Sequence, residues 1–389
     1  MVRSGMIAAL VAAAMAAAPG GAAAQGLAGP YLAATSADQN NQYALAAEFY
    51  AKAVDRDQKN APLLQNALVA MLAAGRFAQA EQAAERLAAL EPGNQIAALT
   101  ELAIAFRDGA YDRAAAIADD RGARMNPLLQ GLTSGWAAVG AGDYDAALQA
   151  FDALDQNETL ATYGQYHKAL ALALAGDFAA AASLLDGEDG TPLHVNRAAM
   201  IAHIASLSQS DQAERALDMA ELALSDGLAD RQMVALRDTL SAGQPVAFDV
   251  IGSASEGAAM VFSVIGSALS RDDASRFSLI YARLATLIWD GYDEARILAA
   301  NVLYDQGQYD LAITAFAEIE PASPWHLSAE VGRAEAMQRA GRAEEAIEVL
   351  SSLSREVPGE LSVLTGLGDI YRANERFEDA NGAYTRALD

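Results

Sequence analysis

Apolar and small residues recur along this chain at a nearly constant spacing, with polar stretches between them. The clearest recurring pattern is a glycine, an aromatic residue two places later, and an alanine three places after that aromatic residue. The glycines of this pattern lie 33 or 34 residues apart within two runs, and they are Gly75, Gly109, Gly142, Gly176, Gly307 and Gly341, the last with Ala343 in the aromatic position. A fixed period of this size predicts helix pairs, each of which buries its apolar face only against a neighbouring pair.

The unit that begins at Leu361 carries the pattern most completely. Its large and small residues occupy relative positions 4, 7, 8, 11, 20, 24 and 27 and are Leu364, Leu367, Gly368, Tyr371, Ala380, Tyr384 and Ala387. Small residues at positions 8 and 20 let the two helices of a pair approach closely, and the large residues fill the seam between them. This pattern resembles the tetratricopeptide repeat. The resemblance implies an all-α fold, a right-handed superhelical solenoid of antiparallel helix pairs with about ten repeats.

The period indicates where the repeats begin. Strong units start near residues 27, 61, 95, 128, 162, 293, 327 and 361, and weaker units start near residues 194 and 255. We therefore divide the chain into a signal peptide at 1–24, an N-terminal stack at 25–185, a degenerate repeat with an irregular linker at 186–253, and a C-terminal stack at 254–389.

The repeat loses its phase in the middle of the chain. Residues 241–252 have no helical period and carry β-branched and aromatic residues, so we expect an extended segment that crosses between the two stacks, with a position along the groove as one arrangement. A functional segment and a plain connector both remain open. Beyond it, the apolar residues of 260–265 and 277–288 predict two helices, the second with the spacing of an amphipathic core helix.

The first 24 residues have the features of a signal peptide. Arg3 gives a short positive start, residues 6–18 form an uncharged apolar run, and three alanines precede Gln25 as in a cleavage site. A membrane anchor is the alternative, but the run is shorter than the about 20 residues that span a bilayer. We therefore expect cleavage near Gln25, a periplasmic location, and no membrane insertion after cleavage.

The composition narrows the class of partner. The formal net charge of −25 disfavours nucleic acid and anionic membranes, because binding to phosphates depends on lysine and arginine. An acidic surface can serve solubility alone or attract a basic partner. The chain has no cysteine, which excludes disulfides, a thiolate nucleophile, a cysteine-bound metal and a lipid-modified cysteine.

No catalytic or metal-binding pattern is present in the sequence. It lacks a Gly-x-Ser-x-Gly nucleophile elbow, a phosphate-binding loop with lysine, a His-Glu-x-x-His motif and a dinucleotide-binding fingerprint. The four histidines are too scattered to indicate a ligand set, and they are His167, His194, His203 and His326. We therefore predict no enzyme activity, no cofactor and no metal site.

The resemblance also implies which side chains face a partner. In tetratricopeptide repeats the first helix of each pair lines a concave groove, and the groove residues carried over to this chain are Trp136, Tyr163, Tyr166, His167, Asn301, Tyr304 and Arg339. Tyrosine and tryptophan provide large contact areas with few rotors, which favours them at interaction hot spots. Packing in the seam between repeats is the alternative for Trp136. Two known groove types, a carboxylate clamp and an asparagine ladder, lack their defining residues here, so no specific ligand is implied.

These patterns predict a non-catalytic scaffold of the bacterial cell envelope that binds a protein or peptide partner in its concave groove. The alternative is an accessory repeat domain that recruits substrate to an envelope polysaccharide or glycosyl-transfer machine. At the C-terminal end, the last unit lacks a capping helix and leaves Phe377, Tyr384 and Leu388 uncovered. We therefore expect either self-association through this end or a longer native chain.

Overall fold

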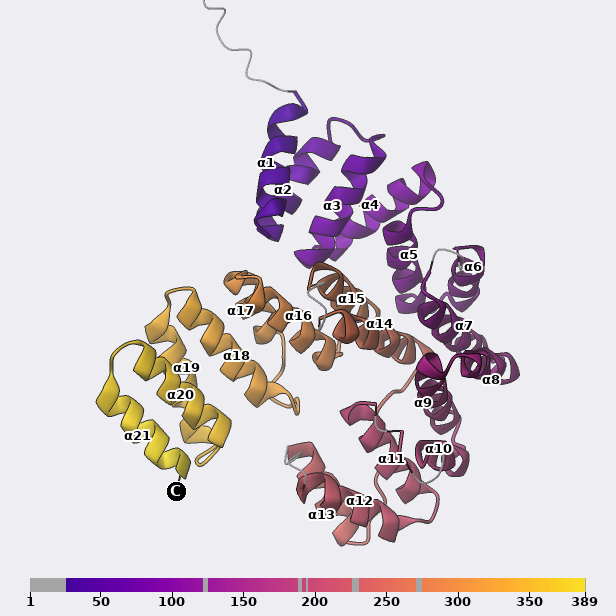
Figure 1. The fold of residues 1–389 in the computed structure, drawn as a ribbon, viewed down its shortest axis with the longest axis vertical. Coiled ribbons are helices and arrows are strands. Elements are labelled where there is room, and N and C mark those ends of the chain that lie inside the picture. The colour runs from indigo at the N-terminus through magenta and orange to yellow at the C-terminus, as the bar shows by residue number, and fades with distance from the viewer. Residues whose placement is uncertain are drawn as a thin grey trace, which may run out of the picture.

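The computed structural model describes residues 26–121, 125–187, 191–193, 195–225, 231–270 and 275–388. Within these ranges the chain forms 21 α-helices, one short 3₁₀ helix and no strand, and the predicted all-α solenoid is confirmed (Figure 1). The predicted signal peptide at 1–24 and His194 lie outside the described residues.

Ten α-helices form the first arm as five antiparallel pairs, coloured indigo to magenta in Figure 1. They are α1 (Ala28–Gln39), α2 (Tyr43–Val54), α3 (Ala61–Ala73), α4 (Phe77–Leu90), α5 (Gln95–Arg107), α6 (Tyr111–Arg121), α7 (Pro127–Ala141), α8 (Tyr144–Asp152), α9 (Glu158–Leu174) and α10 (Phe178–Leu185). The 3₁₀ helix η2 (Ala153–Gln156) lies between α8 and α9.

The remaining α-helices form a group of three, a central hairpin and a last arm of three pairs. The group of three holds α11 (Arg197–Gln209), α12 (Ala213–Ser225) and α13 (Arg231–Ser241). The central hairpin holds α14 (Ala254–Ser270) and α15 (Ser275–Ile288). The last arm holds α16 (Asp293–Asp305), α17 (Tyr309–Ala317), α18 (His326–Arg339), α19 (Ala343–Glu356), α20 (Leu361–Ala373) and α21 (Phe377–Leu388).

Asparagine side chains determine where most first helices of the first arm begin. Asn60, Asn94, Asn126 and Asn157 each accept a hydrogen bond from a backbone N–H in the first turn of the helix that follows. The starts agree with the period, except that α9 begins four residues before the predicted residue 162 because Asn157 caps it there.

The turn inside each repeat pair contains one residue with left-handed backbone. Gly142 is an example, with a φ of 82° that glycine adopts without strain. Three turns use another residue type, with φ between 55° and 60°, at Asn41, Asp211 and Glu375. These three residues continue the period of the glycines, so the repeat extends to α1–α2, α11–α12 and α20–α21, where no glycine marks it.

Helix α15 joins the two arms because it is buried on two sides. Ile280 and Leu284 belong to the core of the first arm, which includes α14. Leu279 and Ala282 belong to a second core that continues through the last arm. Residues 254–288, which the sequence assigned to the C-terminal stack, thus pack against both arms.

The segment between α13 and α14 contains no helix, in line with the sequence. Val246 donates its backbone N–H to the Ser208 hydroxyl at 2.9 Å, and the Gln209 amide donates to the Val246 carbonyl at 2.6 Å. The side chains of Val246 and Ile251 are buried. The segment therefore packs on α11 and returns the chain to the central hairpin.

Candidate functional site

The groove of the first arm is filled by the chain's own central hairpin. Helices α3, α5, α7 and α9 are the first helices of their pairs, and each of them contacts α14 or α15. Figure 1 shows the hairpin in the middle of the molecule, between the first arm and the last. Buried residues of the first arm and the hairpin form one continuous core. The surface that this kind of repeat offers to a partner is therefore occupied along α3 to α9.

The contact between α7 and α14 is close because a glycine faces an aromatic ring. A β-carbon at Gly257 would lie 2.4 Å from the Trp136 ring, well inside van der Waals contact. Nearby, the hydroxyls of Tyr111 and Ser255 lie 3.2 Å apart, and Ser255 donates to the Phe106 carbonyl at 2.5 Å. The start of α14 is thus bound to the first arm by both apolar and polar contacts.

Trp136, Tyr166 and His167 are fully buried, which corrects the expectation that they line an open groove. The Trp136 indole donates from Nε1 to His167 Nδ1 at 3.0 Å, with the two rings edge to face. Because Nδ1 accepts this bond, His167 is neutral and carries its proton on Nε2. Burial lowers the pKa of His167 to about 3, which keeps it neutral at ordinary pH. The physical reason for the correction is α14, which lies against both α7 and α9.

Tyr163 is half-buried and lines a cavity of about 220 Å³ where four segments meet. We name this cavity the junction pocket, and its lining residues are Tyr163, Val195, Asn196, Ser263, Val264, Ser267, Ala268, Tyr292 and Glu294. They come from α9, the start of α11, α14 and the start of α16. Sequence reasoning identified Tyr163 and missed the others, because segments so far apart in sequence give no local signal of their contact.

The last arm exposes polar side chains on its first helices. Asn301 and Arg339 are exposed and Tyr304 is half-buried, and the Arg339 guanidinium donates from Nε to Tyr304 Oη at 3.3 Å. The structure thus brings two of the predicted residues into contact and places Asn301 earlier on the same helix as Tyr304. We name this surface the polar face, and it consists of Asn301, Tyr304, Glu335, Arg339, Asp369 and Arg372.

The polar face carries both acidic and basic side chains. Partial burial raises the pKa of Glu335, the neighbouring Asp369 charge raises it further, and Arg339 acts in the opposite direction. Asp369 pairs with Arg372 at 3.1 Å and accepts a hydrogen bond from the Tyr384 hydroxyl at 2.8 Å. The surface therefore offers donors, acceptors and both charges, which suits hydrogen bonding to a polypeptide more than burial of an apolar helix.

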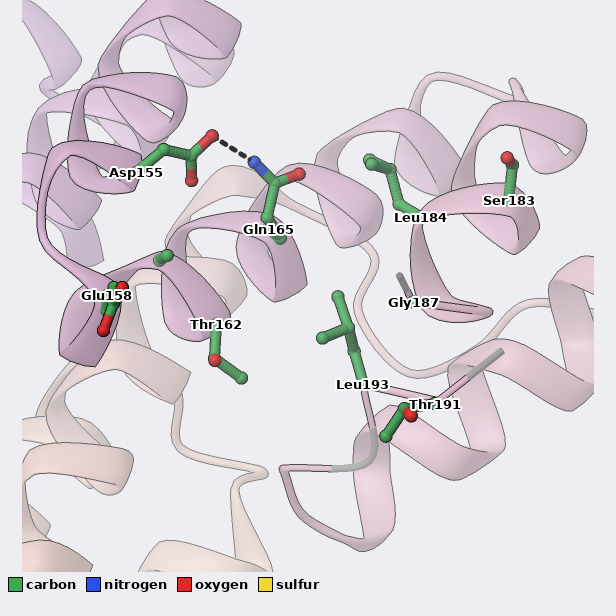
Figure 2. Close-up of a pocket in the computed structure, with 10 residues that line it drawn as sticks. Asp155, Glu158, Thr162, Gln165, Ser183, Leu184, Gly187, Thr191 and Leu193 are labelled. Atoms are coloured by element: carbon green, nitrogen blue, oxygen red, sulfur yellow. Dashed lines mark hydrogen bonds between the residues drawn. The ribbon is translucent and has the colours of Figure 1, made fainter. Parts of the chain in front are cut away.

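A third surface feature is a pocket of about 600 Å³ beside α9 and α10, shown in Figure 2. Gln165 points toward Asp155 and donates to its carboxylate at 2.6 Å, while Leu193 and Thr191 lie on the opposite wall. The described residues that line this pocket include no aromatic side chain and are Asp155, Glu158, Ala161, Thr162, Gln165, Ser183, Leu184, Gly187, Thr191 and Leu193. Its lining therefore mixes polar side chains with the apolar Leu184, Leu193 and Ala161.

Neither a metal-ligating cluster nor a membrane-spanning helix is found in the described part of the chain. Among the described residues, no group of three or more histidine, aspartate or glutamate side chains could hold a metal ion. Within the described ranges, no helix combines the length and the apolar character needed to cross a membrane. The absence of a cofactor stays a prediction.

Comparison with known families supports the repeat pattern. One model of the tetratricopeptide repeat matches residues 132–192, and another matches residues 303–370. No curated protein matches the sequence significantly.

Three of the solved structures that match this chain are the following. The P58(IPK) TPR domain is 15% identical, with coverage of 90% of this chain and 98% of that chain and a TM-score of 0.27. The structure of Naa15/Naa10 bound to HypK-THB is 12% identical, with coverage of 93% and 70% and a TM-score of 0.36. Yeast Tom70 is 12% identical, with coverage of 93% and 91% and a TM-score of 0.29. At these scores no role of those proteins follows for this chain.

The period, the helix pairs and the two matched segments lead to the same conclusion. The turns that carry the glycine pattern lie between the two helices of their pairs. The chain carries tetratricopeptide-type repeats in the two matched segments, residues 132–192 and 303–370.

Proposed function

We propose that this chain is a non-catalytic scaffold of the bacterial cell envelope that binds a polypeptide partner on the polar face of its last arm. Proteins with this fold are typically interaction scaffolds. The observation that carries the proposal is the exposure of Asn301 and Arg339, while the groove of the first arm is filled by the central hairpin. Among the described residues, the first helices of the last arm therefore have exposed inner positions.

The residue types on the polar face support a protein partner. Tyrosine and arginine dominate interaction hot spots, because a ring or a planar guanidinium gives contact area and hydrogen bonds together. Tyr304 and Arg339 are already hydrogen-bonded to each other, so a partner meets them partly fixed in position.

Site-specific photo-crosslinking in the producing cell tests the place of binding. A crosslinker at Asn301 or Arg339 is expected to yield a discrete adduct with one polypeptide, whereas a crosslinker at Glu348, which is exposed on α19, is not. Tyr304→Ala combined with Arg339→Ala should then weaken binding by about 2 kcal/mol, or about thirtyfold. Adducts of equal yield at all three positions, or binding unchanged in the double variant, would refute the polar face as the binding surface.

The envelope location rests on the sequence of the first 24 residues. Export by a cleaved signal peptide predicts a mature N-terminus at or near Gln25 in the periplasmic fraction. N-terminal sequencing decides this. An intact Met1 in the membrane fraction would remove the periplasmic placement and leave the binding surface untouched.

A second candidate function is recruitment of an envelope polysaccharide. The pocket in Figure 2 favours it, since Asp155, Glu158 and Gln165 present oxygen and amide groups of the kind that hydrogen-bond to sugar hydroxyls. The absence of an aromatic side chain among its described lining residues makes this candidate the weaker one. Titration with envelope glycan fragments tests it, and binding that Asp155→Asn leaves unchanged would count against this pocket.

Self-association through α21 is a further part of the proposal. Phe377 and Leu388 are 65% and 89% exposed on this helix, which supports contact with a second copy of the chain. Light scattering should show dimers that Phe377→Ser with Leu388→Ser returns to monomers. A monomer at high concentration in the unmodified protein would rule this out.

A further inference from the structure

The junction pocket contains a carboxylate that no cation of the described residues pairs with directly. Glu294 accepts one hydrogen bond there, from the Tyr292 hydroxyl at a long 3.4 Å, and it forms no ion pair. Burial raises the pKa of Glu294, while Arg197 lowers it from a distance. Arg197 itself lies over the Trp325 ring at 5.4 Å and donates to Gln232 at 3.0 Å. The Glu294 carboxylate is therefore poorly solvated and only partly compensated by charge.

The other polar groups around the pocket are rich in hydrogen-bond acceptors. Ser263 and Ser267 line it with hydroxyl oxygens, and Tyr163 and Tyr292 add aromatic rings whose faces attract cations. The amide of Asn196 is the exception, and its oxygen is engaged in capping α11.

A buried tyrosine hydroxyl lies close to the same group of residues. Tyr166 Oη has no hydrogen-bond partner, although the Asn196 side chain is near enough to act on it. Burial raises the pKa of Tyr166, and the charge of Glu294 raises it further, which places this hydroxyl within electrostatic reach of the carboxylate. An unpaired buried hydroxyl is unfavourable. The Tyr166 hydroxyl can therefore still form a hydrogen bond within this group of residues.

We propose that the junction pocket binds an alkylammonium group, supplied by a small free amine or by a lysine side chain. An ammonium group brings three N–H donors and one positive charge, which matches a carboxylate surrounded by hydroxyl oxygens and tyrosine rings. A cavity of about 220 Å³ has room for such a group with a short carbon chain but excludes a large ligand. The net charge of −25 attracts cations to the protein as a whole. The inference does not depend on the polar face as a partner-binding surface.

Calorimetric titration of the full chain with three probes tests the chemistry. n-Butylammonium should bind, and n-butanol, which has nearly the same shape and no charge, should bind at least about tenfold more weakly. Nα-acetyl-lysine methylamide distinguishes the source. Tighter binding of this probe than of n-butylammonium assigns the pocket to a lysine of a polypeptide, and the reverse assigns it to a free amine.

Variants locate the binding. Glu294→Gln preserves shape and removes the charge, so n-butylammonium affinity should fall about tenfold or more. Glu348→Gln makes the same change in charge on an exposed site of α19 and should leave the affinity unchanged. Tyr163→Leu tests the ring and serves as the second variant if Glu294→Gln reduces folding, which circular dichroism monitors.

Three results would overturn the proposal. They are no n-butylammonium binding by the unmodified chain, equal binding of n-butanol, and equal affinity in the folded Glu294→Gln and Glu348→Gln variants.

Discussion

The first arm and the last arm are built from the same repeat, yet their inner faces differ. In α3, α5, α7 and α9 of the first arm, relative position 9 is apolar and buried or half-buried, and it holds Val69, Ala103, Trp136 and Leu170. In the last arm the same position is polar and exposed, and it holds Asn301, Glu335 and Asp369. The same repeat therefore provides a buried core in the first arm and an exposed polar face in the last arm.

The difference shows that an apolar inner face needs to be covered. An apolar groove left open to water is an interaction site or a liability, and this chain covers its own with α14 and α15. The central hairpin occupies this groove in the way that a bound helix of a partner would. Because α15 is buried on two sides, it also fixes the last arm to the first.

Trp136→Ala should have the largest effect on stability. The indole is fully buried and hydrogen-bonded to His167, so its removal leaves a cavity and an unpaired histidine nitrogen. The free energy of unfolding should fall by about 3–5 kcal/mol. Urea unfolding measures this, and a loss within about 0.5 kcal/mol would mean that the ring lies on an open surface.

Gly257→Ala should separate α14 from α7. The added methyl group would overlap the Trp136 ring, and the expected destabilisation is about 2–3 kcal/mol. Gly382→Ala is the matched control, because it is also helical and has no atom within 4 Å of the added carbon. The control should be neutral or more stable by about 0.5–1 kcal/mol. Equal effects of the two changes would contradict a close contact between hairpin and arm.

His167 should make the first arm sensitive to acid. Its pKa falls from 6.5 to about 3 on burial, so below pH 6.5 the unfolded chain binds a proton that the folded chain does not. The free energy of unfolding is therefore unaffected by His167 above pH 6.5. Below pH 6.5 the preference of the unfolded chain for a proton on His167 lowers the free energy of unfolding by about 1.4 kcal/mol per pH unit. Between pH 7.5 and pH 5.5, His167→Asn should lose about 1.4 kcal/mol less than the unmodified chain. Parallel pH profiles of the two proteins would show that His167 is accessible to water.

Asn301→Ala and Arg339→Ala should have the smallest effect. Both side chains are exposed, so each change should alter the free energy of unfolding by no more than about 0.5 kcal/mol. Differential scanning calorimetry checks this. A loss of more than about 2 kcal/mol would mean that the inner face of the last arm is also covered.

The sequence predicts the repeats well because each repeat depends on local and neighbouring contacts. The helix starts follow from the period, and asparagine caps such as Asn60 and Asn94 lie where units were expected to begin. The turns at Asn41 and Glu375 lack the glycine because other residues occupy the left-handed conformation there, and the remaining positions of the units near 27 and 361 still predict those pairs.

The filled groove could not be predicted in the same way. Trp136 and Gly257 meet although they are more than 100 residues apart, and nothing near either residue records that contact. A tryptophan at an inner position looks the same in sequence whether a partner or the chain's own helix covers it. The contrast at relative position 9 was the available signal, since the apolar residues there in α3, α5, α7 and α9 and the polar residues in the last arm distinguish the two faces.

Thiol accessibility at matched inner positions tests the difference between the arms most directly. The chain has no cysteine, so Ala103→Cys and Asn301→Cys each place one thiol at relative position 9, in the first and the last arm. Modification by a small disulfide reagent should be at least about 100-fold slower for Ala103→Cys, because the hairpin must open before the reagent enters. Asn301→Cys should react at the rate of an exposed thiol. Equal rates in two folded variants would contradict a first-arm groove that the central hairpin fills.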